Sequence, residues 1–205
     1  MRNINQKLES YGLIDIKHLA PKILSDIRYS TPNNFTGKIL YKEPFGLYAA
    51  PPLAQAIADI CIWLEKNMPD YQLMLFDAAR PLSIQKEMFE IVKGSAFEPY
   101  IANPNDDIPG GFHNYGLAVD MTLADSLGNP LDMGTDYDFF GVESHSFTEP
   151  YLLEKGKMCP TALANRFLLY SVAGRFGLLP HPNEWWHFQL TYSEESKKQY
   201  QLLCF

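Results

Sequence analysis

Two short segments about seventy residues apart carry the side chains best suited to chemistry. The first holds His113 and Asp120, and the second holds Glu184 and His187. Two imidazoles and a carboxylate can bind zinc as three protein ligands and leave a fourth position open for water. A further carboxylate beside such a site can accept a proton from that water. The two segments together therefore indicate a zinc-dependent hydrolase.

Each segment also has an explanation without a metal. Asp120 is flanked by apolar residues in a candidate strand, where an unpaired carboxylate is unfavourable. A metal would compensate the charge, but Asp120 could equally be a hydrogen-bonded structural residue and His113 an ordinary loop residue. Likewise, Glu184 and His187 could be incidental members of a Trp-rich core strand. Only the combination of the two segments favours the metal.

The spacing of Glu184 and His187 needs a local bend. Strict alternation along a strand would place the two side chains on opposite faces. The preceding segment 180–183 contains two prolines and predicts a bend at Glu184, so that the carboxylate can stand beside the metal without binding it. His181 could replace His187 as a ligand, although its place between two prolines favours a flexible loop.

Residues farther upstream add candidates for contacts with a substrate. Arg80 follows a candidate buried strand and precedes Pro81, a position from which its guanidinium could hold an oxyanion or a carboxylate. Taken alone, such an Arg would be a surface residue. The polar segment 26–37, which includes Tyr29, by itself indicates only a structured loop, and His145 is expected at most at the rim of a site.

The elements that must position these side chains are a mixture of helices and strands. Apolar residues at helical spacing predict helices at 52–68, from Ser83 to a stop at Gly94, at 161–176 and at 193–203. Apolar and aromatic runs predict strands at 71–77, 117–123 and 185–191. The loop at 95–112 is long enough to be a functional rim or lid. Regular βαβ alternation is absent, so we expect a single α+β domain over residues 1–205, with a small, mostly antiparallel sheet flanked by helices and the site in a cleft.

Composition limits the partners. The 205 residues have a formal net charge of −7 and no cluster of Lys or Arg, which argues against nucleic acid or an anionic membrane. The N-terminus lacks the apolar core of a secretory signal, and no run approaches the roughly 20 apolar residues of a membrane span. Three widely spaced cysteines suggest no disulfide framework. We expect a soluble cytoplasmic protein, and the sequence does not indicate its oligomeric state.

Taken in order, these motifs resemble the D-alanyl-D-alanine metallopeptidases, and most closely the D-Ala-D-Ala dipeptidases of the VanX type. The likeness is carried by His-x-x-Gly-x-Ala-x-Asp at 113–120 and Glu-x-x-His at 184–187. Supporting segments extend it over most of the chain, at 29–37, 77–81 and 133–145. One departure is Gly111, which stands where the family usually has a Ser that helps to frame the substrate, so it bears on substrate preference.

The resemblance implies a role for each candidate residue. One zinc ion per chain would be held by His113, Asp120 and His187. Glu184 would be the general base, and Arg80 would stabilise the tetrahedral transition state. Tyr29 and Asp138 would lie near the free amino group of a small dipeptide.

The expected activity is hydrolysis of D-alanyl-D-alanine to free amino acids, a peptidoglycan-related reaction. A D,D-carboxypeptidase or another stem-peptide peptidase on the same metal core is the nearest alternative, and it would act on acylated peptides. A zinc module that binds peptides without catalysis is a second alternative, although it would need neither Glu184 nor Arg80. A metal-free globular domain is the third, and metal analysis would distinguish it.

Overall fold

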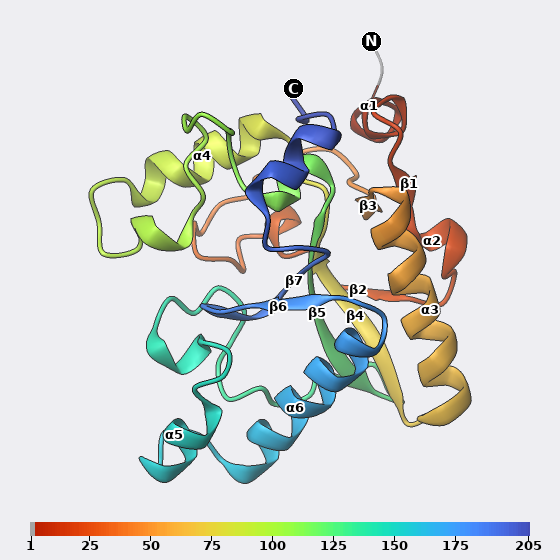
Figure 1. Cartoon of the computed structure of the whole chain (residues 1–205), viewed down its shortest axis with the longest axis vertical. Helices are drawn as coiled ribbons and strands as arrows, with labels where there is room; N and C mark the ends of the chain where they lie inside the picture. The colour runs from red at the N-terminus through yellow and green to blue at the C-terminus, as the bar shows by residue number, and fades with distance from the viewer. Residues whose placement is uncertain (1–2) are drawn as a thin grey trace.

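A five-stranded sheet forms the centre of the computed structural model, which describes residues 3–205 (Figure 1). The strand order is β2-β4-β5-β7-β6, and only β2 and β4 are parallel neighbours. The strands are β2 (Leu24–Ser25), β4 (Tyr71–Asp77), β5 (Ala118–Asp125), β6 (Leu179–His181) and β7 (Glu184–Gln189). A second, antiparallel sheet pairs β1 (Ile14–Asp15) with β3 (Tyr48–Ala49). The expected α+β fold with a mostly antiparallel sheet is confirmed.

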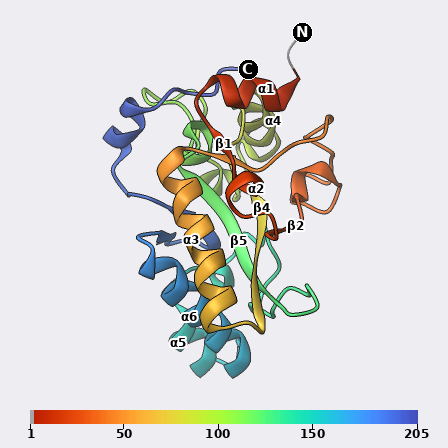
Figure 2. The same cartoon turned by 90° about the vertical axis from the view of Figure 1, so that its right-hand side faces the viewer.

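Two long helices cover the sheet. The first, α3 (Pro51–Asn67), packs along β4 and crosses in front of β4 and β5 in Figure 2. The second, α6 (Pro160–Arg175), contacts β6 and β5. The remaining α-helices are α1 (Ile4–Ser10), α2 (Ile16–Leu19), α4 (Leu82–Val92) and α5 (Glu149–Glu154). Short 3-10 helices are η1 (Arg28–Ser30), η2 (Glu98–Tyr100), η3 (Phe112–Tyr115), η4 (Val142–Ser144) and η5 (Glu194–Gln199).

The local sequence explains α3 and β4. Proline occupies the first turn of α3, where its missing N–H leaves no bond unmade. The buried residues of the helix recur at helical spacing and face the sheet, whereas Ile62 on the other side is exposed. All residues of β4 from Leu73 onward are buried, as expected for a strand covered by a helix. Both predicted elements are confirmed, as are α4, α6 and β5, with ends shifted by one or two residues.

The C-terminal segment differs from its prediction. Instead of a helix over 193–203, the chain forms the short η5 and then continues without regular structure. The reason lies in tertiary hydrogen bonds: Leu82 N–H donates to the Leu203 carbonyl, and Leu203 N–H donates to the Asn114 carbonyl. These bonds and the burial of Leu203 tie the segment to α4 and η3, and they replace the hydrogen bonds of a helix.

The segment before Glu184 also differs. Segment 180–183 was expected as a bent entry with His181 in a flexible loop, but Leu179–His181 form β6 and pair with β7 in a hairpin that turns at Pro182 and Asn183. β7 begins at Glu184 itself, one residue earlier than predicted. The irregularity that the sequence required is present as a shift in the pairing between the two strands. His181 is therefore a strand residue rather than a flexible one.

Both ends of the described chain lie at the same end of the molecule (Figures 1 and 2). There the ring of Tyr11, just after α1, packs against the ring of Phe205, with 5.5 Å between their centroids. Within residues 3–205, no helix combines the length and the apolar character needed to cross a membrane.

Candidate metal centre

A row of polar residues crosses three neighbouring strands at the same level. Asp77 of β4 pairs with Asp120 of β5, and Asp120 pairs with His187 of β7. A bulge between Leu75 and Asp77 sets this register. Residues directly opposite on antiparallel strands have their Cβ atoms about 5 Å apart. The sheet therefore brings together side chains that are far apart in the sequence.

His113 joins this row from η3. The atoms His113 Nε2 and Asp120 Oδ1 are 3.2 Å apart, His113 Nε2 and His187 Nδ1 are 3.1 Å apart, and His187 Nδ1 and Asp120 Oδ1 are 3.3 Å apart. Zinc bonds of 2.0–2.1 Å at tetrahedral angles separate two donors by about 3.3 Å. The three predicted ligands thus have the spacing of one face of a zinc tetrahedron. Among the described residues, they form the one group of acidic, His or Cys side chains close enough to hold a metal.

Hydrogen bonds on the outer side of each ring fix which nitrogens face inward. Nδ1 of His113 lies 2.7 Å from the Ala78 carbonyl, which can only accept, so that nitrogen carries the proton. Nε2 of His187 lies 3.0 Å from Oε1 of Gln189, whose amide group in turn donates to the Thr191 carbonyl. A neutral ring with its proton outside presents a lone pair inside.

Two imidazole lone pairs and the Asp120 carboxylate therefore converge with no proton between them. Burial lowers the pKa of His187, which keeps its ring neutral. Three acceptors in a buried site repel one another unless a cation lies among them. The donor set and its outer partners fit zinc.

Glu184 lies beside this triad without being part of it. Its Oε2 atom is 3.6 Å from Nδ1 of His187. Burial, followed by the charges of Asp120 and Asp138, raises the pKa of the Glu184 carboxyl well above its ordinary value. A carboxyl with a raised pKa takes up a proton more readily than a free carboxyl and can release it again. The structure brings Glu184 to the position in which the sequence analysis expected it.

Arg80 is buried on the Asp77 side of the row. Its Nε and Nη2 atoms donate to Oδ2 of Asp77 at 2.9 and 2.7 Å, and Nη1 donates to Oε1 of Gln85 at 3.0 Å. A guanidinium has five N–H groups, so two remain for another acceptor. Although burial disfavours its charge, Asp77 holds the pKa of Arg80 above the ordinary value. Arg80 is therefore a fixed cation at the wall of the cavity rather than a surface residue.

Tyr29 and Asp138 form a hydrogen-bonded pair close to Arg80, whose guanidinium lies 5.1 Å from the centroid of the Tyr29 ring. The Tyr29 hydroxyl donates to Oδ1 of Asp138 at 3.0 Å, and the N–H of Phe35 donates to Oδ2. Asp138 has a left-handed backbone with φ of 62°, which is uncommon outside glycine and often marks functional positions. Burial, with a contribution from the charge of Asp120, raises the pKa of Asp138 to about 7. Tyr137 connects this pair to the triad through hydrogen bonds to Tyr29 and to Oδ2 of Asp120.

All seven predicted site residues line one cavity of about 400 Å³. The long loop contributes residues from Pro99 to Gly111 to its wall, which confirms the expectation of a functional rim. Trp186 and His181 line it as well. Burial, and then the neighbouring His187, lowers the pKa of His181 to about 3, and the two rings lie 5.1 Å apart. His145 lies outside the lining and bonds to the Tyr100 hydroxyl, whose ring is part of the wall.

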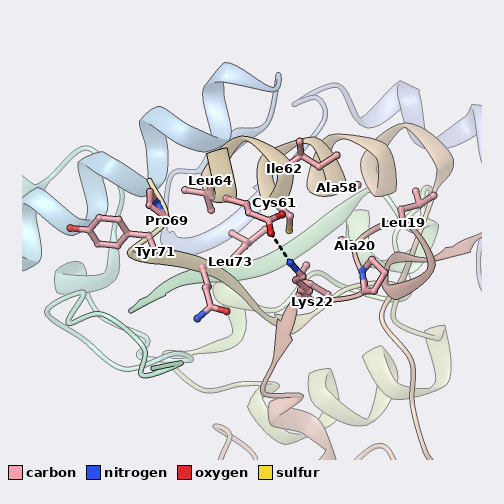
Figure 3. Close-up of a pocket in the computed structure, with 14 residues that line it drawn as sticks. Leu19, Ala20, Lys22, Ala58, Cys61, Ile62, Leu64, Pro69, Tyr71 and Leu73 are labelled. Carbon is pink, nitrogen blue, oxygen red and sulfur yellow. Dashed lines mark hydrogen bonds and ion pairs between the residues drawn. The ribbon is translucent and has the colours of Figure 1, made fainter. Parts of the chain in front are cut away.

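A second cavity lies between α3, the start of β4 and the segment that joins α2 to β2 (Figure 3). Its wall is mostly apolar and includes Cys61, whose pKa is raised to about 12 by burial. The exposed ammonium of Lys22 reaches the Glu65 carboxylate there at 2.6 Å. It shares no lining residue with the metal centre, so it adds nothing to the chemistry of that site.

Sequence reasoning missed the residues that hold the predicted ones in place. Gln189 orients His187, Tyr137 links Asp120 to Tyr29, and Gln85 positions Arg80. Gln189 could have been found, because a residue two positions after a ligand lies on the same face of a strand. Gln85 lies on a helix, and its position in the sequence does not indicate that it contacts Arg80.

The fold and the site define a metallopeptidase. A model of the M15 peptidase family, described as D-ala-D-ala dipeptidase, matches residues 9–203, and the chain belongs to this family. It is similar to the D-alanyl-D-alanine dipeptidase of Escherichia coli, with 29% identity over 178 residues that cover 87% of this chain and 84% of the relative. A D-alanyl-D-alanine dipeptidase of Synechocystis is 29% identical over 147 residues, 58% of this chain and 60% of that protein.

Among solved structures, the chain resembles a zinc-bound variant of the vancomycin-resistance D,D-pentapeptidase VanY from a VanB-type cassette. The sequence identity is 17% and the TM-score is 0.42. The match covers 77% of this chain and 80% of that one.

Proposed function

We propose that this protein is a zinc-dependent dipeptidase that hydrolyses D-alanyl-D-alanine and related small dipeptides to free amino acids. The observation that carries the proposal is the convergence of three inward-facing acceptors, on His113, Asp120 and His187, beside the carboxyl of Glu184. We take the chain as one catalytic domain with one zinc ion, because the cavity draws its wall from segments between Tyr29 and Lys197.

The protein's own residues supply proton transfer and charge stabilisation. When bound, zinc would lower the pKa of water and polarise a peptide carbonyl. Glu184 accepts the proton of the attacking water and later passes it to the leaving amine, a role that its raised pKa supports. The two N–H groups of Arg80 not used by Asp77 and Gln85 stabilise the oxyanion of the tetrahedral transition state.

Asp138 gives the proposal its substrate class. Its carboxyl is the acidic group in the wall that bonds to Tyr29, and it is not part of the triad, whose one acidic member is Asp120. An incoming ammonium would favour the ionised form of this carboxyl and bond to it. In a dipeptide, the residue before the scissile bond carries the free amino terminus. The names of the Escherichia coli and Synechocystis relatives support D-alanyl-D-alanine as that dipeptide.

A D,D-carboxypeptidase acting on acylated stem peptides is the second candidate. Such an enzyme has an amide where the dipeptide has an ammonium, so it has no use for an acidic pocket there. Burying a carboxylate against a neutral acyl group would be unfavourable. A zinc module that only binds peptides would have no use for a base beside the metal.

The test compares free D-alanyl-D-alanine with an N-acylated pentapeptide that ends in the same two residues, with products identified by mass spectrometry. The zinc-loaded protein should cleave the free dipeptide and leave the acylated peptide essentially intact. Asp138→Asn should lower kcat/KM for the free dipeptide by ten- to a hundredfold, because a charge-assisted bond to the ammonium is lost. Asp136→Asn, at an exposed position two residues earlier, is the control. Preference for the acylated peptide would contradict the dipeptidase assignment.

A further inference from the structure

A buried lysine lies in the wall of the cavity and takes no part in the chemistry described above. Lys197, in η5, is only 2% exposed. Its ammonium donates to the Gly110 carbonyl at 2.8 Å and pairs with the Glu194 carboxylate. It also lies over the face of Phe112, 4.8 Å from the ring centroid. Lysine is almost never fully buried unless its charge is paired, as it is here.

The ammonium of Lys197 can donate a further hydrogen bond. It has three N–H groups, of which the Gly110 carbonyl and Glu194 take two. Glu194 is itself 57% exposed at its side chain, so it can turn toward water and share the cation. Lys197 and Glu194 both line the cavity that contains the triad.

A dipeptide brings two opposite charges into this cavity. Asp138 can pair with the substrate ammonium. The substrate carboxylate needs a cation in turn, since a charge buried without a partner is strongly unfavourable. Among the described residues that line the cavity, Arg80 and Lys197 are the two with the cationic side chain of an Arg or a Lys. Arg80 is neutralised by two bonds to Asp77 and lies on the Tyr29 side, where its guanidinium is 5.1 Å from the Tyr29 ring centroid.

Lys197 reaches the cavity wall through contacts other than those that hold Asp138. Its partner Gly110 is three residues before His113, whereas Asp138 is connected to Asp120 through Tyr29 and Tyr137. The cavity wall therefore offers a separate charged group for each end of a bound dipeptide. Building on the proposed function, we infer that Lys197 binds the α-carboxylate of the substrate and makes the enzyme selective for a free C-terminus.

The neighbouring Gly111 supports this assignment. A Cβ atom at this position would lie 3.2 Å from the Cβ of Ala102, closer than normal packing allows. The loop that carries Ala102 thus closes over Gly111 and leaves no room for a side chain there without a shift. Position 111 offers no side-chain donor of its own, and Lys197, bonded to the adjacent Gly110 carbonyl, is the cation in this part of the wall.

The experiment compares D-alanyl-D-alanine with D-alanyl-D-alaninamide, whose C-terminus is neutral, on the zinc-loaded protein. Wild type should prefer the free acid by at least tenfold in kcat/KM. Lys197→Met should lower kcat/KM for the acid by ten- to a hundredfold, chiefly through KM, and change the value for the amide less than twofold. Lys198→Met is the matched control, because Lys198 pairs with Glu195 at the same spacing but is exposed, and it should leave both values unchanged.

A second variant covers the case in which Lys197→Met does not fold. Glu194→Gln removes the competing carboxylate from an exposed side chain, so it should raise kcat/KM for the acid and not for the amide. Melting temperature and zinc content are measured for every variant. A role confined to holding η5 against Gly110 predicts equal losses on both substrates, and that result would overturn the inference, as would the absence of a selective gain in Glu194→Gln.

The outcomes also separate this inference from the proposed function. If free dipeptides are cleaved but Lys197→Met affects acid and amide equally, the lysine assignment is wrong and the dipeptidase stands. If only N-acylated peptides are cleaved, the dipeptidase is wrong, and a selective loss on their free-acid forms would still support Lys197. If neither kind of peptide is cleaved by the zinc-loaded wild type, both proposals are contradicted.

Discussion

At the scale of single residues, the site depends on hydrogen bonds that lie outside the metal triad. The Ala78 carbonyl and the Gln189 amide each hold the outer nitrogen of one imidazole, which leaves the inner nitrogen free for a metal. The orientation of the Gln189 amide is itself fixed by the Thr191 carbonyl. Partners of this kind typically change metal affinity ten- to a hundredfold when removed.

Gln189→Leu should therefore weaken zinc binding by about ten- to a hundredfold, because the His187 ring loses the acceptor that sets its tautomer. Competition with a chromophoric chelator measures the affinity directly. Gln55→Leu is the control, because Gln55 lies exposed on α3 and bonds only to Asp59. Unchanged zinc affinity in Gln189→Leu would show that this hydrogen bond does not prepare the ligand.

The sequence predicted the chemically conspicuous residues but not their supports. His113, Asp120, Glu184 and His187 stood out because imidazoles and carboxylates at that spacing have few other uses together. Tyr137 did not stand out, although its hydroxyl lies 2.8 Å from Asp120. A tyrosine is an ordinary core residue by composition, and only the folded arrangement shows which group its hydroxyl reaches.

At the scale of elements, three neighbouring strands carry the site, and α3 packs against the first of them. The row Asp77, Asp120, His187 depends on the register of β4, β5 and β7, which is set by the packing of their buried faces. α3 contributes to that packing through fully buried residues such as Ile57. The stability of this helix on the sheet should follow the burial of each side chain.

Ile57→Ala should lower the free energy of unfolding by about 2–5 kcal/mol, because it leaves a cavity between α3 and the sheet. Ile62→Ala on the same helix should change it by about 0.5 kcal/mol or less, since that side chain is 61% exposed. Urea denaturation of the two variants and wild type gives both values. Equal losses in the two variants would mean that the helix packs differently from this structure.

Elements were predictable where local pattern and tertiary packing agree. α3, β4 and α4 have apolar residues at the spacing of their own secondary structure, and each was predicted nearly to its ends. The segment 193–203 was predicted as a helix, yet its buried Leu203 bonds to the backbone of Leu82 and Asn114. Such long-range bonds leave no trace in the local sequence, so the helix was predicted there and did not form.

At the scale of the whole molecule, one cavity gathers residues from nearly the full length of the chain. Tyr29 lies close to one end of the sequence and Lys197 to the other, and both line the cavity around the triad. The family resemblance could assign roles to motif positions before the fold was known. It could not assign a role to Lys197, whose place in the wall depends on the C-terminal segment being held against η3 and α4.

The central claim is that the triad holds the metal while Glu184 moves the proton. The most direct measurement determines zinc content and turnover of D-alanyl-D-alanine on the same sample of Glu184→Gln, beside wild type. We expect about one zinc per chain in both proteins and a loss of turnover of about a hundred- to ten-thousandfold in the variant, because general base catalysis is removed while the three ligands remain. Turnover that survives, or zinc that is lost together with activity, would contradict it.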